Sequence, residues 1–344
     1  MNKFLFCCLQ IAVVFTLYMS PFLLSAQEPD TNNAVTTLNS IRLVEQYREE
    51  ACGAVISLDF ALALEKIKKA NNLTSSLKDV SGNGEIILSG AQLLYYLESY
   101  DKAAKLNSIA IAKLKASQNT EKLAGALSLQ GFISTKLSQF SASENYFKQA
   151  AALYSTHNDE RGKSSILLGQ GILEFEKDNP KVALNYLNAG IAKYTEFTMS
   201  FQQASGLLYK AKALLLLEDD PAKTYLLQAI TTLEDALQII EDKNYKKLKI
   251  DTYQINATVA LKQGEGVKAK NMLEEYTSKI AALKVKNSSL ISAIYTAQPT
   301  VLEIQKETIP LDEELLDEEK TESFNVITNG LSIAIIAILS LLTL

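Results

Sequence analysis

QGFISTKLSQFSASENYFKQA (130–150) and QGILEFEKDNPKVALNYLNAG (170–190) are two copies of one unit, placed 40 residues apart. Gly131 recurs as Gly171, and the bulky Phe147 is matched by Leu187. A period of roughly 20–50 residues built on helical patterns is typical of a solenoid, in which short supersecondary units stack on one another. The spacing of this stretch therefore predicts a repeat protein.

Small residues keep the same spacing along most of the chain. Three series do so: Ala51, Ala91, Gly131, Gly171 and Ala211, then Ala257; Ala63, Ala103, Ser143 and Ala183; and Ala70, Ala110, Ala150 and Gly190. Turn-forming residues separate the first series from the second, so each unit is predicted to be a helix, a tight turn and a second helix. Small side chains let facing helices approach closely, and stacked hairpins bury what one hairpin cannot. The alternative is a generic helical bundle with chance periodicity.

These residues resemble the tetratricopeptide repeat family, whose pattern places a Leu-Gly/Ala pair in the first helix and an aromatic residue after the turn. Six units fit, beginning near Val44, Gly84, Ala124, Ser164, Ala204 and Ile250. The resemblance implies an all-α fold, an α-α superhelical solenoid over residues 44–283. The chain departs from the family in lacking Trp and in its period of 40, against roughly 34. Its fifth unit has Lys223 and Ile230 where small residues are expected, and about six extra residues.

The N-terminal segment has the pattern of a secretory signal peptide. Lys3 precedes an uncharged run over 4–24, and small Ser25 and Ala26 follow. This pattern predicts export and cleavage after Ala26, although Leu24 at the third position before the cut leaves an uncleaved anchor as an alternative. Residues 27–43 are then a polar lead-in to the first hairpin.

Removal of residues 1–26 leaves one cysteine, Cys52, so the mature chain cannot form an intramolecular disulfide. Cys52 adjoins the small residue Ala51 on a predicted helix, and we expect a packed thiol rather than a redox centre. An exported chain without disulfides is more typical of a bacterial cell envelope than of a eukaryotic extracellular protein.

The charge of the chain is concentrated near its C-terminus. The formal net charge is −5, and the run 312–322 alone contributes −6 from seven acids and one lysine. The remainder is close to neutral and has no basic stripe, which argues against nucleic acid as a partner. We interpret 299–322 as an acidic juxtamembrane linker and 284–298 as a helix that caps the last repeat.

The last 22 residues, 323–344, carry no charge. At 1.5 Å per residue they would span about 33 Å as a helix, enough for a hydrocarbon core of about 30 Å. This predicts a C-terminal transmembrane helix. A buried core helix and a C-terminal lipid-anchor signal are the alternatives.

The layout as a whole resembles the sensory half of tetratricopeptide-repeat sensor histidine kinases of Gram-negative bacteria. The run 319–324 leading into 331–336 is similar to their junction between an acidic stretch and the membrane helix. The resemblance implies periplasmic repeats with an inner-membrane C-terminal anchor and a sensory or scaffolding role in two-component signalling. The phosphoacceptor motif and the ATP lid are absent, so any kinase domain would lie outside this chain. The alternative is an adaptor for assembly of envelope complexes.

No catalytic, cofactor-binding or metal site is predicted. The one histidine, His157, falls in a predicted connector, without cysteines or carboxylates at ligand spacing. No nucleophile has a base placed beside it by a motif, and we expect a protein that is not an enzyme.

Binding is what the predicted scaffold offers. In the family's pattern the first helices line a concave groove. Their exposed positions map to Arg48, Gln92, Tyr96, Phe132, Lys136, Lys212 and Gln254. Aromatic anchors mixed with cationic heads suit a protein or peptide ligand, and a homodimer is a further partner that the layout allows. For Tyr96 and Phe132, packing between the repeats is an equal alternative.

Overall fold

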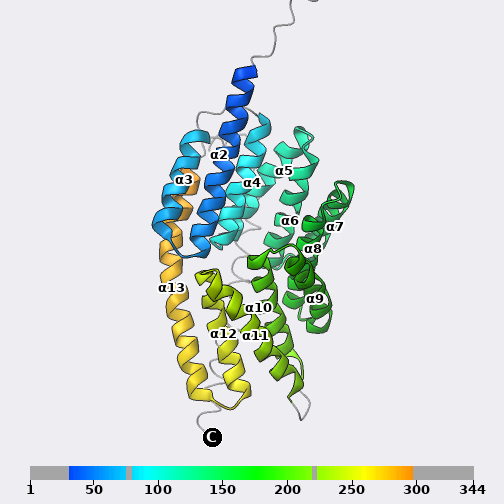
Figure 1. Cartoon of the computed structure of the whole chain (residues 1–344), viewed down its shortest axis with the longest axis vertical. Coiled ribbons are helices and arrows are strands. Elements are labelled where there is room, and N and C mark those ends of the chain that lie inside the picture. Colours follow the sequence, from blue (N-terminus) through cyan, green and yellow to red (C-terminus); the bar gives the residue numbers. More distant parts are fainter. Residues whose placement is uncertain (1–30, 75–79, 219–222, 297–344) are drawn as a thin grey trace, which may run out of the picture. The chain divides into compact units, whose positions relative to one another are not determined.

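The computed structural model describes residues 31–74, 80–218 and 223–296 (Figure 1). Three predicted segments lie outside them: the signal peptide 1–26, the linker 299–322 and the membrane helix 323–344. Among the described residues, no helix has both the length and the apolar character needed to cross a bilayer. Export and membrane anchoring therefore stay predictions.

Within the described ranges the chain forms twelve helices and no strand, as an all-α fold requires. The bounds are α2 Thr31–Ile56, α3 Phe60–Thr74, α4 Val80–Tyr96, α5 Tyr100–Ala116, α6 Thr120–Lys136, α7 Phe140–Thr156, α8 Glu160–Glu176, α9 Pro180–Glu196, α10 Ser200–Leu216, α11 Thr224–Asp242, α12 Lys246–Lys262 and α13 Gly266–Thr296. Consecutive helices pair into six hairpins, and each first helix also packs on the first helix of the next hairpin. This confirms the predicted stack of six helix-turn-helix units.

Three-residue turns of one kind set the period. The middle residue of each turn has a left-handed backbone, as at Ser138 (φ 59°). The N–H of Ser138 donates to the carbonyl of Thr135 and that of Gln139 to the carbonyl of Ser134, at 3.1 and 2.8 Å, which is the Schellman arrangement. Turns inside a unit and turns between units share this geometry, so helices begin every 20 residues from Tyr100 to Ser200.

The small residues of the three series are all buried between helices. Gly131 shows why. A Cβ at this position would lie 2.5 Å from Cε1 of Phe147, and one at Gly169 would lie 2.5 Å from Cζ of the same ring. The ring of Phe147, 1% exposed, is thus held between a glycine of α6 and a glycine of α8. The repeated small residues exist because a large partner fills the space they leave.

The fifth unit is more regular than its sequence suggests. A spacing of 40 places Lys223 and Ile230 where small residues are expected. In the structure, however, Lys223 lies in the connection before α11. The small residues of this unit are Ala229 and Ala236, which are both fully buried. They are seven residues apart, as are the corresponding small residues in the second helices of the first four units. The extra residues fall before α11 and shift the register of the unit by six without changing its packing.

Helix bounds differ from the expected ones at three places. The first helix, α2, begins at Thr31, inside the lead-in 27–43. The expected capping helix 284–298 continues the second helix of the sixth unit without a break, as the 31-residue α13. Residues 82–84, whose sequence Gly-Asn-Gly indicates a connector, belong instead to the first turns of α4. The ends of the repeat region are thus more helical than local composition predicts.

The last hairpin contacts the first. Helix α13 packs on α3, and α12 packs on α2; Figure 1 shows α13 running beside α3. The side-chain amide of the buried Asn287 donates to the carbonyl of Leu97 across 3.3 Å. We refer to this contact of α12 and α13 with α2, α3 and the turn after α4 as the seam.

Candidate functional site

Five first helices, α2, α4, α6, α8 and α10, contribute side chains to one cavity of about 650 Å³. We call it the concave cavity. Aromatic rings, serine hydroxyls and the amides of Gln92 and Gln202 line it, together with one cation, Arg48. A pocket of this size with a few polar groups among apolar ones is typical of a ligand site.

The structure brings together four of the seven residues predicted to line a groove. Arg48, Gln92, Tyr96 and Phe132 line the concave cavity. Lys136 instead donates to Glu176 at 2.8 Å and to the hydroxyl of Tyr209 at 2.5 Å. Lys212 lies over the ring of the same tyrosine, 5.2 Å from its centroid. Gln254 is exposed on α12 and does not line the cavity.

Arg48 is the unusual member of the lining. It is 3% exposed, and its Nη1 donates to Oγ of Ser89 across 3.1 Å. No acidic side chain among the described residues forms an ion pair with it, and the exposed Glu49, which also lines the cavity, does not either. Burial lowers the pKa of Arg48 to about 10, so the guanidinium remains cationic at neutral pH. Buried charges in proteins are normally paired.

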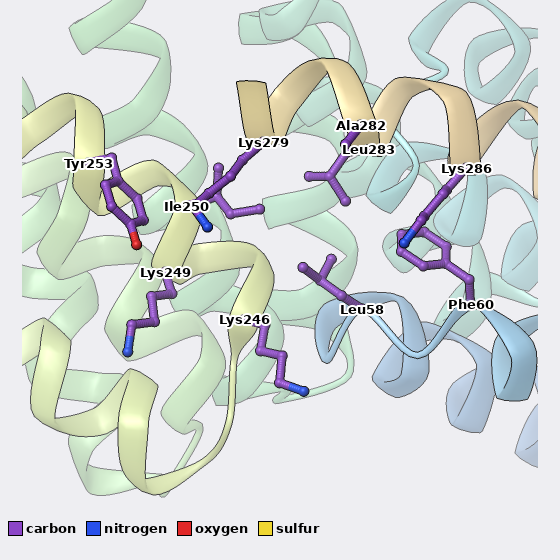
Figure 2. A pocket seen from close by; sticks show the side chains of 10 residues that line it. All are labelled: Leu58, Phe60, Lys246, Lys249, Ile250, Tyr253, Lys279, Ala282, Leu283 and Lys286. Atoms are coloured by element: carbon purple, nitrogen blue, oxygen red, sulfur yellow. The ribbon is translucent and has the colours of Figure 1, made fainter. Parts of the chain in front are cut away.

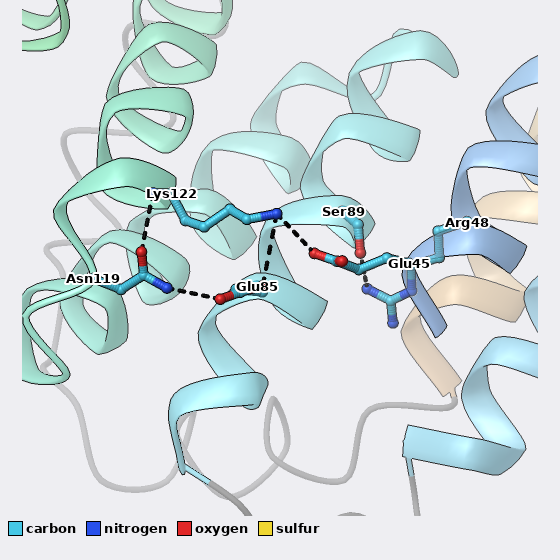
Figure 3. Close-up of polar contacts among 6 residues, drawn as sticks. All are labelled: Glu45, Arg48, Glu85, Ser89, Asn119 and Lys122. Carbon is cyan, nitrogen blue, oxygen red and sulfur yellow. Dashed lines mark hydrogen bonds and ion pairs between the residues drawn. The ribbon is translucent and has the colours of Figure 1, made fainter. Parts of the chain in front are cut away.

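Two acids of the first two units, Glu45 and Glu85, are held by groups other than Arg48 (Figure 3). Lys122 of α6 contacts Glu45 of α2 at 3.1 Å and Glu85 of α4 at 3.7 Å. Asn119 donates to Glu85 at 2.7 Å and accepts from the backbone N–H of Lys122. This network joins the first three units, so neither carboxylate is available to neutralise Arg48.

Cys52 lies one helical turn after Arg48 and also lines the cavity. Burial raises the pKa of its thiol to about 12, outweighing the opposite effect of the Arg48 cation. The thiol is therefore neutral, which does not suit a nucleophile or a metal ligand.

Aromatic rings cross the cavity from one unit to another. Tyr96 of α4 contacts Phe201 of α10, with centroids 5.8 Å apart, and Phe201 contacts Tyr245 at 5.3 Å. Phe132 packs edge-to-face on Phe147 at 5.3 Å. Tyr96 and Phe132 are only half-buried, so each both packs between repeats and presents a face to the cavity.

Sequence analysis missed the tyrosines that second helices supply. Tyr154 of α7 and Tyr194 of α9 line the cavity although the groove was assigned to first helices alone. The hydroxyl of Tyr194 donates to the carbonyl of Ser164 at 3.1 Å, and burial raises its pKa. The two tyrosines are 40 residues apart, so the repeat spacing was a signal that could have found them.

In the part of the chain that the structure describes, no three His, Cys, Asp or Glu side chains gather to hold a metal ion. His157 is the exposed C-cap residue of α7, and its Nε2 lies 3.0 Å from Oγ1 of Thr120. The cavity presents one buried cation, neutral hydrogen-bonding groups and aromatic faces.

No family model matches this chain, and no curated protein matches it. Among solved structures, it is similar to the Rap conjugation gene regulator of the plasmid pLS20 in complex with the Phr peptide. The two are 14% identical with a TM-score of 0.49 over 84% of this chain and 81% of that one. A tetratricopeptide repeat protein from Parabacteroides merdae is 15% identical, with a TM-score of 0.34 over 74% and 99%.

Proposed function

We propose that this chain is a non-catalytic binding module whose concave cavity takes a segment of another polypeptide and pairs an anionic group of that segment with Arg48. The observation that carries the proposal is a guanidinium, 3% exposed, that lines a cavity and has no acidic partner among the described residues. A guanidinium presents five donors, of which Ser89 accepts one. A carboxylate could accept two more in the bidentate geometry that favours Arg over Lys.

The rest of the lining suits a peptide rather than a compact metabolite. Residues from five successive units face the cavity, so its contacts extend across repeats instead of converging on one point. The amides of Gln92 and Gln202 can both donate to and accept from a peptide backbone. Half-buried rings such as Tyr96 and Phe132 offer faces to side chains, and aromatic residues are enriched where binding energy concentrates.

A library of short synthetic peptides tests the proposal. One position carries Asp or Glu in half of the library and Asn or Gln in the other half, and the C-terminus is free or amidated. The full-length protein should retain peptides that carry an anionic group, and Arg48→Met should abolish that preference. Arg48→Lys should keep part of it, because it preserves the charge but not the fork of donors. Arg42→Met, an exposed position on the same helix, is the matched control.

Equal retention of neutral and anionic peptides, or an unchanged preference in Arg48→Met, would contradict the role of Arg48. Retention of no peptide by the native protein would contradict the proposal as a whole.

For cellular context, the module is proposed to be exported and anchored in the inner membrane of a bacterial envelope with its repeats in the periplasm. It would serve as the sensory or scaffolding part of a two-component histidine kinase whose kinase domain is outside this chain. Support comes from the patterns of 1–26 and 323–344 and from the acidic run between repeats and span. Fractionation of cells should place the protein in the membrane, with repeats that protease reaches only after the outer membrane is permeabilised.

An envelope assembly adaptor is the second candidate, since no phosphoacceptor motif is present in the sequence. The DNA beyond codon 344 separates the two: a kinase frame, intact or shifted, supports the sensor, and neighbouring assembly genes support the adaptor. A homodimer is compatible with either role, and light scattering of the full-length protein tests it.

A further inference from the structure

A second cavity lies at the seam, apart from the concave cavity (Figure 2). It has a volume of about 380 Å³ and is formed by the turn between α2 and α3, by α12 and by α13. Its apolar lining includes Leu58, Ile250 and Leu283, with Phe60 at the α3 side and Tyr253 at the α12 side. We call it the seam slot.

Four lysines surround this apolar lining: Lys246 and Lys249 on α12, and Lys279 and Lys286 on α13. Figure 2 shows Lys279 and Lys286 reaching from α13 toward the α12 and α3 sides of the slot. The ammonium of Lys279 lies 5.3 Å from the ring centroid of Tyr253, and that of Lys286 lies 5.4 Å from that of Phe60. The aliphatic stems of such lysines extend an apolar wall while their heads stay at the rim.

No acidic side chain lines the seam slot in the described part of the chain. Lys249 pairs with Glu241 at 2.9 Å and Lys279 with Glu275 at 3.4 Å. Both acids are at least half exposed, so these pairs are weak and a ligand can replace them at little cost. An acid on the adjoining surface, Asp59, caps α3, since its Oδ1 accepts from the N–H of Leu62.

We infer that the seam slot is a binding site for a small amphiphilic anion, an aliphatic carboxylate. The apolar lining would hold the hydrocarbon chain, and the α13 lysines would hold the carboxylate at the rim. An excess of cations around an apolar depression, without acids inside it, is complementary to a ligand that is apolar at one end and anionic at the other. Separate ammonium groups act as point charges, which suits a single carboxylate at the mouth better than a planar, bidentate partner.

Such a ligand would touch α12, α13 and the first hairpin together, so it would add contacts across the seam. The inference does not depend on the peptide proposal, because the seam slot and the concave cavity share no lining residue.

Titration with decanoate tests the inference. The full-length protein is reconstituted in nanodiscs of zwitterionic lipid, empty nanodiscs serve as the blank, and binding is followed by saturation-transfer NMR. Decanoate should bind, its affinity should fall as salt is raised, and neither acetate nor decanol should displace it. Lys279→Gln combined with Lys286→Gln should weaken binding about tenfold, since it removes two ion-pair contacts. Lys268→Gln combined with Lys270→Gln, exposed on the same helix, is the matched control and should bind as the native protein does.

A second variant fills the slot without changing its charge. Ala282 is an exposed lining residue, and Ala282→Trp should abolish decanoate binding while the thermal unfolding midpoint stays close to the native value. Decanol binding as tightly as decanoate would overturn the inference, as would full affinity in the double lysine variant. Binding of an acidic leucine-rich peptide at the slot in the absence of decanoate binding would overturn it too. Arg48→Met should leave decanoate binding intact, so failure of one proposal is distinguishable from failure of the other.

Discussion

Lys247 of α12 donates a hydrogen bond across 2.5 Å to Glu98, which lies 149 residues earlier in the chain. Glu98 is the left-handed residue of the turn after α4, with φ 61°. The same turn provides the carbonyl of Leu97, which accepts from Asn287 of α13. One tight turn of the second unit therefore holds both helices of the last unit, and the seam depends on the position of that turn.

A double-mutant cycle should measure this link. Lys247→Met and Glu98→Gln each remove one charge and keep most of the side chain. We expect a coupling free energy of about 0.5–1 kcal/mol in urea unfolding, because the lysine is mostly buried but the carboxylate is 43% exposed. The pair Lys268–Glu265, local to one helix end, is the control and should show less coupling. Zero coupling between Lys247 and Glu98 would mean that this ion pair does not stabilise the seam.

Adding one methyl group at Gly131 should be costly. The Cβ of Gly131→Ala would lie 2.5 Å from the buried ring of Phe147, which cannot retreat because Gly169 lies against it. Overpacking of this kind costs about 1–3 kcal/mol of unfolding free energy. Gly125→Ala on the same helix is the control. Its Cβ meets only the hydroxyl of Tyr154 at 3.9 Å, so it should stabilise by about 0.5–1 kcal/mol through lower chain entropy. Similar effects for both variants would contradict the packing account.

The left-handed turn positions predict stabilising substitutions. Thr198 has φ 56°, which is strained for a β-branched residue. Thr198→Gly should raise the unfolding free energy by about 0.5–1 kcal/mol. This is the backbone strain that the substitution relieves, minus the conformational entropy that glycine adds to the unfolded chain. Asn158→Gly should gain less, because asparagine tolerates this conformation. Gly264→Ala, at φ 83° and with open space around its Cβ, should lose about 1 kcal/mol through backbone strain alone. Urea unfolding of the three variants checks the order.

Glu85 should make stability depend on pH. Burial raises the pKa of this carboxyl above its ordinary value of 4.5, Lys122 opposes the shift, and Glu45 adds to it. A carboxyl with a raised pKa in the folded state binds its proton more tightly there. Its contribution to stability is thus full below pH 4.5 and is lost as the pH rises through the raised pKa. Relative to Glu85→Gln, the native protein should become less stable as urea titrations move from pH 4.5 to neutral pH.

Glu160→Gln is the comparison variant, because Glu160 should make stability depend on pH in the opposite direction. The hydrogen bond from Lys163 lowers the pKa of Glu160, so its contribution is present above the ordinary pKa and is lost as the pH falls. For each variant, the measured quantity is the difference in unfolding free energy between the native protein and the variant as a function of pH. If this difference changed in the same direction with pH for both variants, the raised pKa of Glu85 would be contradicted.

Arg48→Met should stabilise the protein while it removes anionic-peptide binding. A buried cation without an acidic partner costs free energy, and methionine fills similar volume without a charge. We expect the unfolding free energy to rise by about 1–3 kcal/mol. Arg42→Met on the exposed side of α2 should change it by less than about 0.5 kcal/mol. A marked loss of stability in Arg48→Met would show that the guanidinium serves the fold rather than a ligand.

Most of the fold is predictable from sequence because it is periodic and local. The spacing of 40 between residues such as Gly131 and Gly171 predicts the hairpins, and the structure confirms them. The prediction failed in the fifth unit and at residues 82–84. In the first case an insertion shifted the register. In the second, Gly84 lies closely against Leu114 of α5, so packing in the hairpin outweighed the low helix propensity of glycine.

The candidate site is predictable only in part. Repeat position places Arg48, Gln92, Tyr96 and Phe132 on the concave side, and the structure brings them together. Repeat position alone does not show that Lys136 turns toward Glu176 and Tyr209, because that partner choice depends on distances between different units.

The sequence by itself determined the repeating hairpin, its length and the residues buried inside it, since close packing between neighbouring helices needs small side chains at fixed intervals. Only the tertiary structure decided that Arg48 is buried without an acid, and that α12 and α13 contact the first and second units. Small rotations between successive hairpins add up over six units, and the total rotation cannot be predicted from the residue pattern of any one unit. The seam and its slot follow from that sum, as does the burial of the one cation that lines the concave cavity.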